Sequence, residues 1–466
     1  MVFSSLFFIF LFFPLCLFSY AASGSIHNKN IVLIVFSLIF YAWGEPLYVF
    51  LLLASTFVNF LAGLFIGKYK GKFLDSFSTF FAVAFDIIML GIFKYSGFII
   101  ENINLIFHSN FNSPDIHLPI GISFYTFQII SYVIDCHWET VTPQRNFFKL
   151  LMYISLFPQL VAGPIVRYST IEKEIDSRKV NIKDISYGLN RLIIGLAKKV
   201  LIANNLSIVV ESMLGSPHNS TFFSAWFGAA MYALQIYFDF SGYSDMAIGM
   251  GRVFGFHFDE NFNHPFICRD VTEFWQRWHI SLSTFFRDYL LYIPIFGKRR
   301  KYAGLFLVWF CTGLWHGASW NFILWGLYYG LFIFFEMKLG KKQIKKIPLF
   351  IRHVYSKIVI VIGFGIFYYE DLGNLGCFFK NIFGFGSNGF ISSSDKITFV
   401  NNVYLIIAAV ILSFPVISLF KKMSERIYPA KICISAVSAF CMPIILLICS
   451  IMLVDATKNP FLYFRF

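Results

Sequence analysis

Residues 302–335 form the sequence YAGLFLVWFCTGLWHGASWNFILWGLYYGLFIFF, which contains no Asp, Glu, Lys or Arg. About 20 apolar residues in a helix are enough to cross the roughly 30 Å hydrocarbon core of a bilayer. Because lipid offers the backbone no hydrogen-bond partners, such a stretch must be helical. Gly313 and Gly317 interrupt the stretch on either side of His316, which predicts a broken helix or a re-entrant hairpin instead of one simple crossing.

The composition extends this conclusion to the whole chain. Its 466 residues are 58% hydrophobic and only 14% charged, and the mean hydropathy is +0.68. These values exclude a soluble globular protein, a disordered chain and a nucleic-acid-binding protein. Ten apolar blocks are long enough to cross a membrane: 3–22, 31–47, 48–66, 77–98, 118–135, 186–210, 222–247, 350–369, 401–420 and 434–454. We therefore expect an all-α integral membrane protein, a single polytopic domain over residues 1–466 with about ten transmembrane helices.

A second apolar block, 150–166, also departs from a simple crossing. It is interrupted at Pro158 and Pro164, and proline removes a backbone donor from a helix. Irregular backbone is tolerated at membrane depth only where it is buried in protein or lines a water-filled cavity. The two re-entrant candidates, 150–166 and 302–335, are therefore the places where we expect a functional site.

The net charge of +13 indicates how the chain is oriented in the membrane, because Lys and Arg collect in cytoplasmic loops. The basic clusters are Lys68, Lys70 and Lys72; residues 252–301; Lys338, Lys341, Lys342, Lys345 and Lys346; and Lys421, Lys422, Arg426 and Lys431. Ten crossings with both termini outside place all of these clusters on the cytoplasmic face, provided that both re-entrant candidates return to the side they entered. Residues 101–117, 211–221 and 371–400 then lie on the outer face.

Residues 272–291, TEFWQRWHISLSTFFRDYLL, predict an interfacial helix. Four charged side chains would be stranded in lipid if this helix crossed the membrane: Glu273, Arg277, Arg287 and Asp288. Its apolar stripe repeats every three or four residues and consists of Trp275, His279, Leu282, Phe286 and Leu290. His279 therefore lies on the inward-facing stripe, either as a structural side chain that donates to a backbone carbonyl or as a functional one.

His316 is an ionisable side chain in an otherwise apolar stretch, which is by default a functional hypothesis. Burial disfavours the imidazolium, so we expect a neutral imidazole that can accept a proton from an alcohol. The alternative is a structural histidine within a helix core. Asp239 and Asp245 are also at membrane depth, where they either line a tunnel that binds substrate or bond between helices. The eight Cys lack metal-ligand spacing, so no metal site is expected.

Five motifs follow one another along the chain. They are LPIGISFYTFQ at 118–128, FPQLVAGP at 157–164, YFDFSGYSDMA at 237–247, RWHISLSTFFRDYL at 277–290 and LWHGASWNFILWG at 314–326. Together, and in this order, they resemble the bacterial branch of the membrane-bound O-acyltransferase (MBOAT) family. That branch includes the alginate and peptidoglycan O-acetylation membrane proteins and, more distantly, the teichoic-acid D-alanylation protein. The resemblance covers nearly the whole chain.

The resemblance implies a ring of helices around a central funnel, with His316 as the essential residue and His279 as the second family histidine. Ser319 and Trp320, three and four positions beyond His316, are candidate donors to the developing oxyanion if this stretch is helical. The implied activity moves acetyl from a cytosolic thioester, such as acetyl-CoA or an acyl carrier, across the bacterial inner membrane to an extracytoplasmic polysaccharide. The implied partner is a periplasmic esterase-like O-acetyltransferase that completes the transfer.

Several substrates and one other class of protein are consistent with the sequence. An excess of Phe, Lys, Asn and Ile, which suggests an AT-rich genome, favours peptidoglycan over alginate. The alternatives are alginate or another exopolysaccharide, and D-alanyl transfer to teichoic acid. A rival from another class is a transporter or flippase that uses Asp239, Asp245 and His316 as a proton relay and moves its substrate without acyl transfer.

The C-terminal tail, NPFLYFRF at 459–466, has two possible roles. Its aromatic side chains can anchor it at the membrane surface. Alternatively, Tyr463 receives the acetyl group near His316 and presents it to the periplasmic partner, because a phenol becomes a nucleophile once a neutral imidazole takes its proton.

Overall fold

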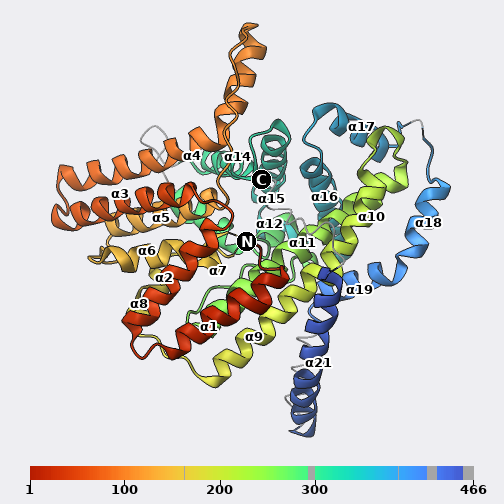
Figure 1. Ribbon diagram of the computed structural model, residues 1–466. Helices are drawn as coiled ribbons and strands as arrows, with labels where there is room; N and C mark the ends of the chain where they lie inside the picture. The colour runs from red at the N-terminus through yellow and green to blue at the C-terminus, as the bar shows by residue number, and fades with distance from the viewer. Residues whose placement is uncertain (162, 292–299, 387, 417–427, 455–466) are drawn as a thin grey trace. The chain divides into compact units, whose positions relative to one another are not determined.

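The computed structural model describes residues 1–161, 163–291, 300–386, 388–416 and 428–454, without the side chains of 428–438 (Figure 1). Within these ranges every regular element is a helix, which confirms the all-α class. The chain divides into two compact units, one of residues 1–192 and 243–259 and the other of residues 193–242 and 260–466.

The first unit is built mainly from the N-terminal helices. They are η1 (Phe8–Phe12), α1 (Phe13–Ala22), α2 (Ile26–Ala42), α3 (Tyr48–Lys68), α4 (Phe73–Phe107), α5 (Ile122–His137), α6 (Phe147–Ser155), α7 (Phe157–Leu160), α8 (Tyr168–Asp176) and most of α9 (Ile182–Ala197). α3, α4 and α5 pack against one another, and α2 packs on α6. The unit's core includes four fully buried tyrosines: Tyr125, Tyr132, Tyr153 and Tyr168.

The second unit contains both histidines of interest. Its elements are η2 (Lys198–Ala203), α10 (Asn204–Leu214), η3 (Pro217–Asn219), the first part of α11 (Phe222–Val253), η4 (Pro265–Ile267), α12 (Val271–Trp275), α13 (Ile280–Tyr289), α14 (Lys301–His316), α15 (Trp320–Ile344), α16 (Leu349–Tyr368), α17 (Leu372–Ile382), α18 (Ser393–Asn401), α19 (Val403–Ser413) and α21 (Tyr428–Val454). α14 and α15 pack along each other, and α16 packs on α15. The core between them is aromatic and includes Trp309, Trp325 and Tyr329.

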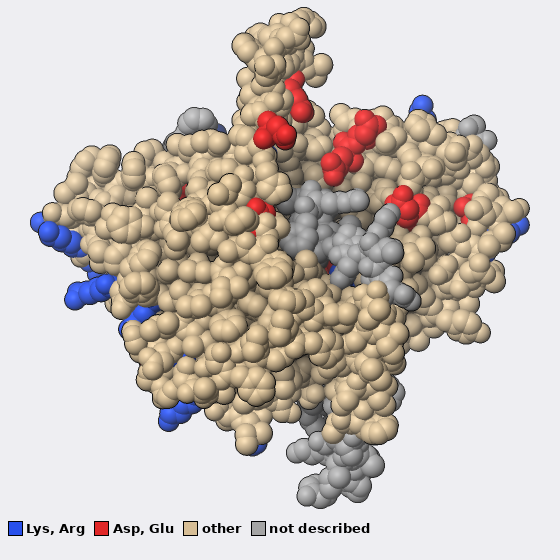
Figure 2. Space-filling view, in the orientation of Figure 1, with Lys and Arg blue, Asp and Glu red and all other residues tan. Residues whose placement is uncertain are grey.

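Long apolar helices confirm that the chain is a multi-pass membrane protein. Each of the ten apolar blocks contains helix, and five described helices are long and apolar enough to cross a bilayer: Tyr48–Lys68, Phe73–Phe107, Ile182–Leu214, Trp320–Ile344 and Leu349–Tyr368. The pair α18 and α19, bent by 62°, is a sixth if it is one broken span. Figure 2 shows the corresponding surface, in which broad areas carry neither basic nor acidic side chains.

The stretch 302–335 is a hairpin of two helices. The sequence predicted interruptions at Gly313 and Gly317, but the helix breaks only after His316. α14 continues through Gly313 and ends at His316, and Gly317 leaves the helix in an extended conformation. Gly313 is therefore not an interruption: a Cβ at this position would overlap the carbonyl oxygen of Phe322, so glycine allows the two helices to approach. The second arm, α15, has 25 residues and is itself long enough to cross.

Two further expectations about irregular helices can be compared with the structure. Residues 272–291 do not form one interfacial helix, because the chain leaves α12 after Trp275 and re-enters a helix, α13, only at Ile280. His279 stands at this break with a left-handed backbone (φ 43°), which cannot continue a right-handed helix. In the 150–166 stretch, α6 ends at Ser155 and is followed by the four-residue, fully buried helix α7.

Candidate active site

The break between α12 and α13 places His279 in the interior of the second unit. Its side chain is only 1% exposed, and its ring contacts Phe240 edge to face at a centroid distance of 4.6 Å and Trp315 at 5.6 Å. Burial lowers the pKa of His279 to about 3, so the imidazole is neutral at physiological pH. The inward-facing position expected for His279 is therefore confirmed, although the helix expected to carry it is broken.

Asn261 is the polar partner of His279. Its side chain is fully buried, and its Oδ1 atom lies 3.2 Å from Nδ1 of His279. The same oxygen accepts hydrogen bonds from the backbone N–H of Ser281 at 3.2 Å and from the Ser281 hydroxyl at 2.9 Å. A backbone bond from the N–H of Ile280 to the carbonyl of Asn261 holds the two segments together. His279 is thus bonded to a side chain, not to a backbone carbonyl as the structural alternative supposed.

His316 ends α14 at the turn of the hairpin. It is 8% exposed, and its ring meets Trp325 at 4.9 Å and Phe367 at 5.1 Å, both nearly edge to face. Trp325 belongs to α15, whereas Phe367 belongs to α16, so three helices contribute to this cage. The aromatic walls exclude water from the imidazole on these sides.

Trp315 connects the two histidines. It contacts the ring of His279 at 5.6 Å and the ring of its neighbour His316 at 4.9 Å. His279 and Trp315, which are 36 positions apart in the sequence and belong to different motifs, are therefore in contact. The structure thus gathers His279 and His316 around a shared aromatic side chain.

Two tryptophans near His316 have buried indole N–H groups. The Nε1 atoms of Trp275 and Trp325 are buried and have no hydrogen-bond partner among the residues that the structure describes. The Trp275 and Trp325 rings contact each other at 5.4 Å, and Trp325 also contacts His316. Because a buried N–H without a partner costs about 1–3 kcal/mol, it is a candidate ligand-binding group.

Ser319 and Trp320 do not stand in the helical relationship to His316 that was expected. The helix ends at His316, and Ser319 is the N-cap of the next helix, α15. Its hydroxyl donates to the carbonyl of Glu370 at 3.4 Å, while Trp320 is 47% exposed. The expectation was wrong because the turn at residues 317–319 redirects the chain between the histidine and these two side chains.

The two aspartates of α11 lie in different units and are both ion-paired. In the second unit, Asp239 and Lys199 are buried and 2.7 Å apart, and Lys199 belongs to the π-helix η2. In the first unit, Asp245 accepts two hydrogen bonds from the Arg191 guanidinium, at 2.8 and 3.0 Å. Both aspartates thus bond between helical segments, which is one of the two roles expected for them.

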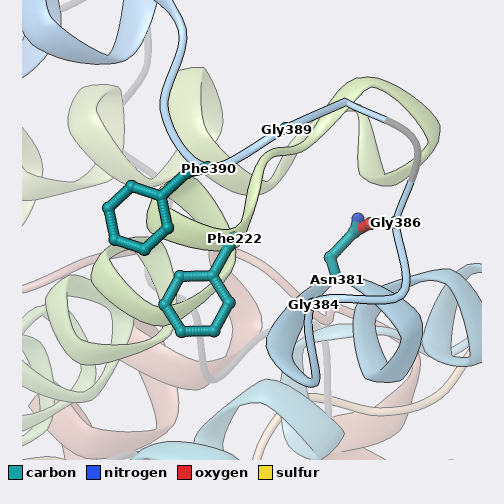
Figure 3. Close-up of a pocket in the computed structure, with 6 residues that line it drawn as sticks. All are labelled: Phe222, Asn381, Gly384, Gly386, Gly389 and Phe390. Atoms are coloured by element: carbon teal, nitrogen blue, oxygen red, sulfur yellow. The ribbon is translucent and has the colours of Figure 1, made fainter.

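Two cavities in the second unit lie outside the cage. One, of about 230 Å³, is lined by Phe222, Asn381, Gly384, Gly386, Gly389 and Phe390 (Figure 3). The rings of Phe222 and Phe390 stack at 5.1 Å on one side of it. The other cavity, of about 340 Å³, lies between apolar side chains of α15 and α16 and includes Glu336 and Arg352. None of the described residues that line the first cavity is titratable. In the second, the Glu336 carboxylate and the Arg352 guanidinium bond to residues 270–272.

The sequence did not single out Asn261, Trp325 or Phe240. Asn261 lies in a loop, where no periodicity marks a buried position. Trp325 and Phe240 lie on long, largely apolar helices, in which periodicity does not distinguish one apolar side chain from another. Tyr463 and the tail 459–466 lie outside the described residues, so the site is built without them.

These features define a multi-pass helical membrane protein with two buried histidines around one indole. The chain matches the model of the membrane-bound O-acyltransferase (MBOAT) family over residues 142–370. It is 39% identical over 396 residues to the probable alginate O-acetylase AlgI of Pseudomonas aeruginosa, covering 83% of this chain and 76% of that protein.

Two further relatives differ in substrate. The chain is 36% identical over 330 residues to the peptidoglycan O-acetyltransferase of Helicobacter pylori, covering 64% of this chain and 62% of that protein. It is 30% identical over 279 residues to the teichoic acid D-alanyltransferase of Bacillus subtilis, covering 54% of this chain and 70% of that protein. The chain belongs to the membrane-bound O-acyltransferase family and is an acyltransferase.

Proposed function

We propose that this acyltransferase moves acetyl from a cytosolic thioester, acetyl-CoA or an acyl carrier, toward an extracytoplasmic polysaccharide. The observation that carries the proposal is the pair His279 and His316, both buried and both in contact with Trp315. Similarity to proteins named for alginate and peptidoglycan O-acetylation supports acetyl as the transferred group. The enzyme works in the bacterial inner membrane, where the donor is on one side and the polymer on the other.

The proposed reaction balances within the site. His316, as a neutral imidazole, takes the proton of an acceptor hydroxyl while the hydroxyl oxygen attacks the thioester carbonyl carbon. The carbon–sulfur bond then breaks, and the proton moves from the imidazolium to the departing sulfur. The negative charge on the carbonyl oxygen needs a donor, for which the buried Trp325 N–H replaces Ser319 and Trp320 as our candidate.

The polymer is a separate part of the proposal. The preference for peptidoglycan came from amino-acid composition, whereas the similarity to an alginate O-acetylase extends over 83% of the chain against 64% for the peptidoglycan enzyme. We therefore propose an exopolysaccharide of the alginate type as the first polymer to test, and peptidoglycan as the second. D-alanyl transfer to teichoic acid is the alternative acyl reaction.

The proposed partner is a periplasmic esterase-like O-acetyltransferase. Without one, the acetyl group would have to pass directly from the membrane site to the polymer. In the partner's presence, an acceptor hydroxyl on the outer face receives the acetyl first. Tyr463 is the proposed residue of this chain for that role, with anchoring of the tail at the membrane surface as the alternative.

The deciding experiment uses purified protein in phospholipid vesicles with radiolabelled acetyl-CoA. We expect loss of the thioester and transfer of label to an acceptor, both dependent on His316. Labelled D-alanyl carrier protein in parallel vesicles tests the alternative acyl group. If the thioester stays intact with every donor while a labelled glycan crosses the vesicle membrane, the proposal is contradicted. That result would support the transporter hypothesis instead.

A further inference from the structure

The hydrogen bonds around Asn261 determine which atom of its amide is the oxygen. Oδ1 lies 3.2 Å from the backbone N–H of Ser281, which can only donate, so the atom at this position must accept. It also lies 2.9 Å from the Ser281 hydroxyl. The orientation of the amide therefore follows from a main-chain donor and does not depend on the histidine.

This orientation assigns the proton of His279. Nδ1 of His279 lies 3.2 Å from an atom that offers only lone pairs, so a favourable contact requires Nδ1 to carry the hydrogen. The Ser281 hydroxyl is 3.5 Å from Nδ1 and 0.6 Å closer to Asn261, so it does not compete as a donor to the ring. In the neutral imidazole the lone pair is then on Nε2.

Nε2 of His279 is buried and has no hydrogen-bond partner in the described part of the chain. The backbone of His279 is left-handed (φ 43°), a conformation that is unfavourable for a residue other than glycine. A strained residue with an unsatisfied acceptor is expected where a ligand supplies the missing donor. An acyl acceptor brings such a donor beside its reacting hydroxyl, for example a second hydroxyl or an N–H group.

We infer that Asn261 is a positioning residue: it holds His279 in the tautomer protonated at Nδ1, so that Nε2 accepts a hydrogen bond from a second donor group of the acyl acceptor, beside the hydroxyl that His316 deprotonates. The inference rests on the proposed acyl transfer for its substrate. It gives the two histidines different tasks, because His316 takes the proton of the attacking hydroxyl and His279 holds a neighbouring donor group of the same acceptor. Asn261 itself touches no substrate.

A double-mutant cycle tests the inference through the rate. Asn261→Leu keeps the branching of the side chain but has no acceptor, and we expect its kcat to fall on the order of 10²-fold with an unchanged KM for acetyl-CoA. Asn261→Asp keeps an oxygen at the same position and should recover most of the rate. If Asn261 acts through His279, the double variant Asn261→Leu/His279→Ala is no slower than His279→Ala alone.

The matched control is Asn59→Leu in the first unit. Asn59 is also buried, and it donates to the carbonyl of Ser55 and to Asp86. We expect fewer folded molecules but an unchanged rate per folded molecule. A wild-type rate in Asn261→Leu, or a further fall in the double variant beyond His279→Ala, would overturn the inference.

A second measurement determines the tautomer of His279 and does not depend on acetyl transfer. Protein labelled with ¹⁵N-histidine in lipid vesicles gives separate NMR signals for protonated and unprotonated ring nitrogens, and the signals of His279 are those missing from His279→Ala. We expect Nδ1 to be protonated in the wild type and the proton to redistribute to Nε2 in Asn261→Leu. Protonation at Nε2 in the wild type would reject the inference even if acetyl transfer is found, whereas absent transfer with the expected tautomer would reject only the proposed function.

Discussion

The carboxylate of Glu336 on α15 accepts two hydrogen bonds from Thr272 on α12, one from its backbone N–H at 2.8 Å and one from its hydroxyl at 2.5 Å. Its other oxygen accepts from the backbone N–H of Val271 at 2.8 Å. Three donors at the start of α12 thus depend on one buried side chain. Glu336 fixes the beginning of the segment that ends at His279.

We expect Glu336→Ala to lower the thermal stability of the purified protein more than Glu336→Gln. Alanine leaves three donors without an acceptor, at about 1–3 kcal/mol for each one that stays buried, whereas glutamine keeps one oxygen. Unfolding in detergent can be followed with a thiol-reactive fluorophore, because Cys16, Cys136 and Cys268 are buried. The exposed Glu101→Ala is the control, and equal midpoints for Glu336→Ala and wild type would refute the role of this carboxylate.

His316→Ala should abolish polymer acetylation and leave the amount of protein in the membrane close to wild type. Its imidazole is proposed to take the hydroxyl proton, and alanine cannot replace it, while the substitution removes only a small ring from the end of α14. Cells that express the variant are assayed for ester-linked acetate and by immunoblot, with the exposed His27→Ala as control. Acetylation at the wild-type level in this variant would disprove the catalytic role of His316.

Trp325→Phe should lower kcat on the order of 10²-fold without changing the KM for acetyl-CoA. Phenylalanine keeps the aromatic contact with His316 but removes the buried N–H that we assign to the oxyanion. Trp309→Phe, in the same aromatic core, is the matched control and should retain its rate. Equal effects of the two substitutions would mean that packing, not the N–H, is responsible.

Single cysteines at Lys342 and Phe385, in an otherwise cysteine-free chain, should react with a membrane-impermeant maleimide from opposite sides. Lys342 belongs to a basic cluster, which favours the cytoplasmic face, whereas Phe385, close to Asn388, lies in the nearly neutral 371–400 segment. Both positions are exposed. Labelling of both from the same side of intact cells would disprove the expected topology.

Tyr463→Phe separates the two roles of the C-terminal tail. The substitution keeps the aromatic ring that would anchor the tail and deletes the hydroxyl that would carry acetyl. We expect polymer acetylation to fall sharply while the amount of protein stays constant. Full acetylation in this variant would reject the relay and leave the anchor.

The sequence alone was sufficient for the class of protein and for the burial of both histidines. Apolar stretches of membrane length force the backbone into helices, and the spacing of Trp275, His279 and Leu282 identified a buried face that the structure confirms. The sequence did not predict the break in the helix at His279. Periodicity indicates which face of a helix a side chain occupies, but it does not indicate where the helix ends. His279 keeps its place on the buried face although its left-handed backbone divides the helix in two.

Only the tertiary structure determined what surrounds the histidines. The bond from His279 to Asn261 joins residues 18 positions apart, and the contact of Trp315 with His279 joins two separate motifs. Such contacts depend on how loops and helices pack, since a buried amide or indole has the same local sequence pattern as any core residue. The same reason explains Ser319 and Trp320: counting along a helix placed them beside His316, and the turn that begins at Gly317 moved them away.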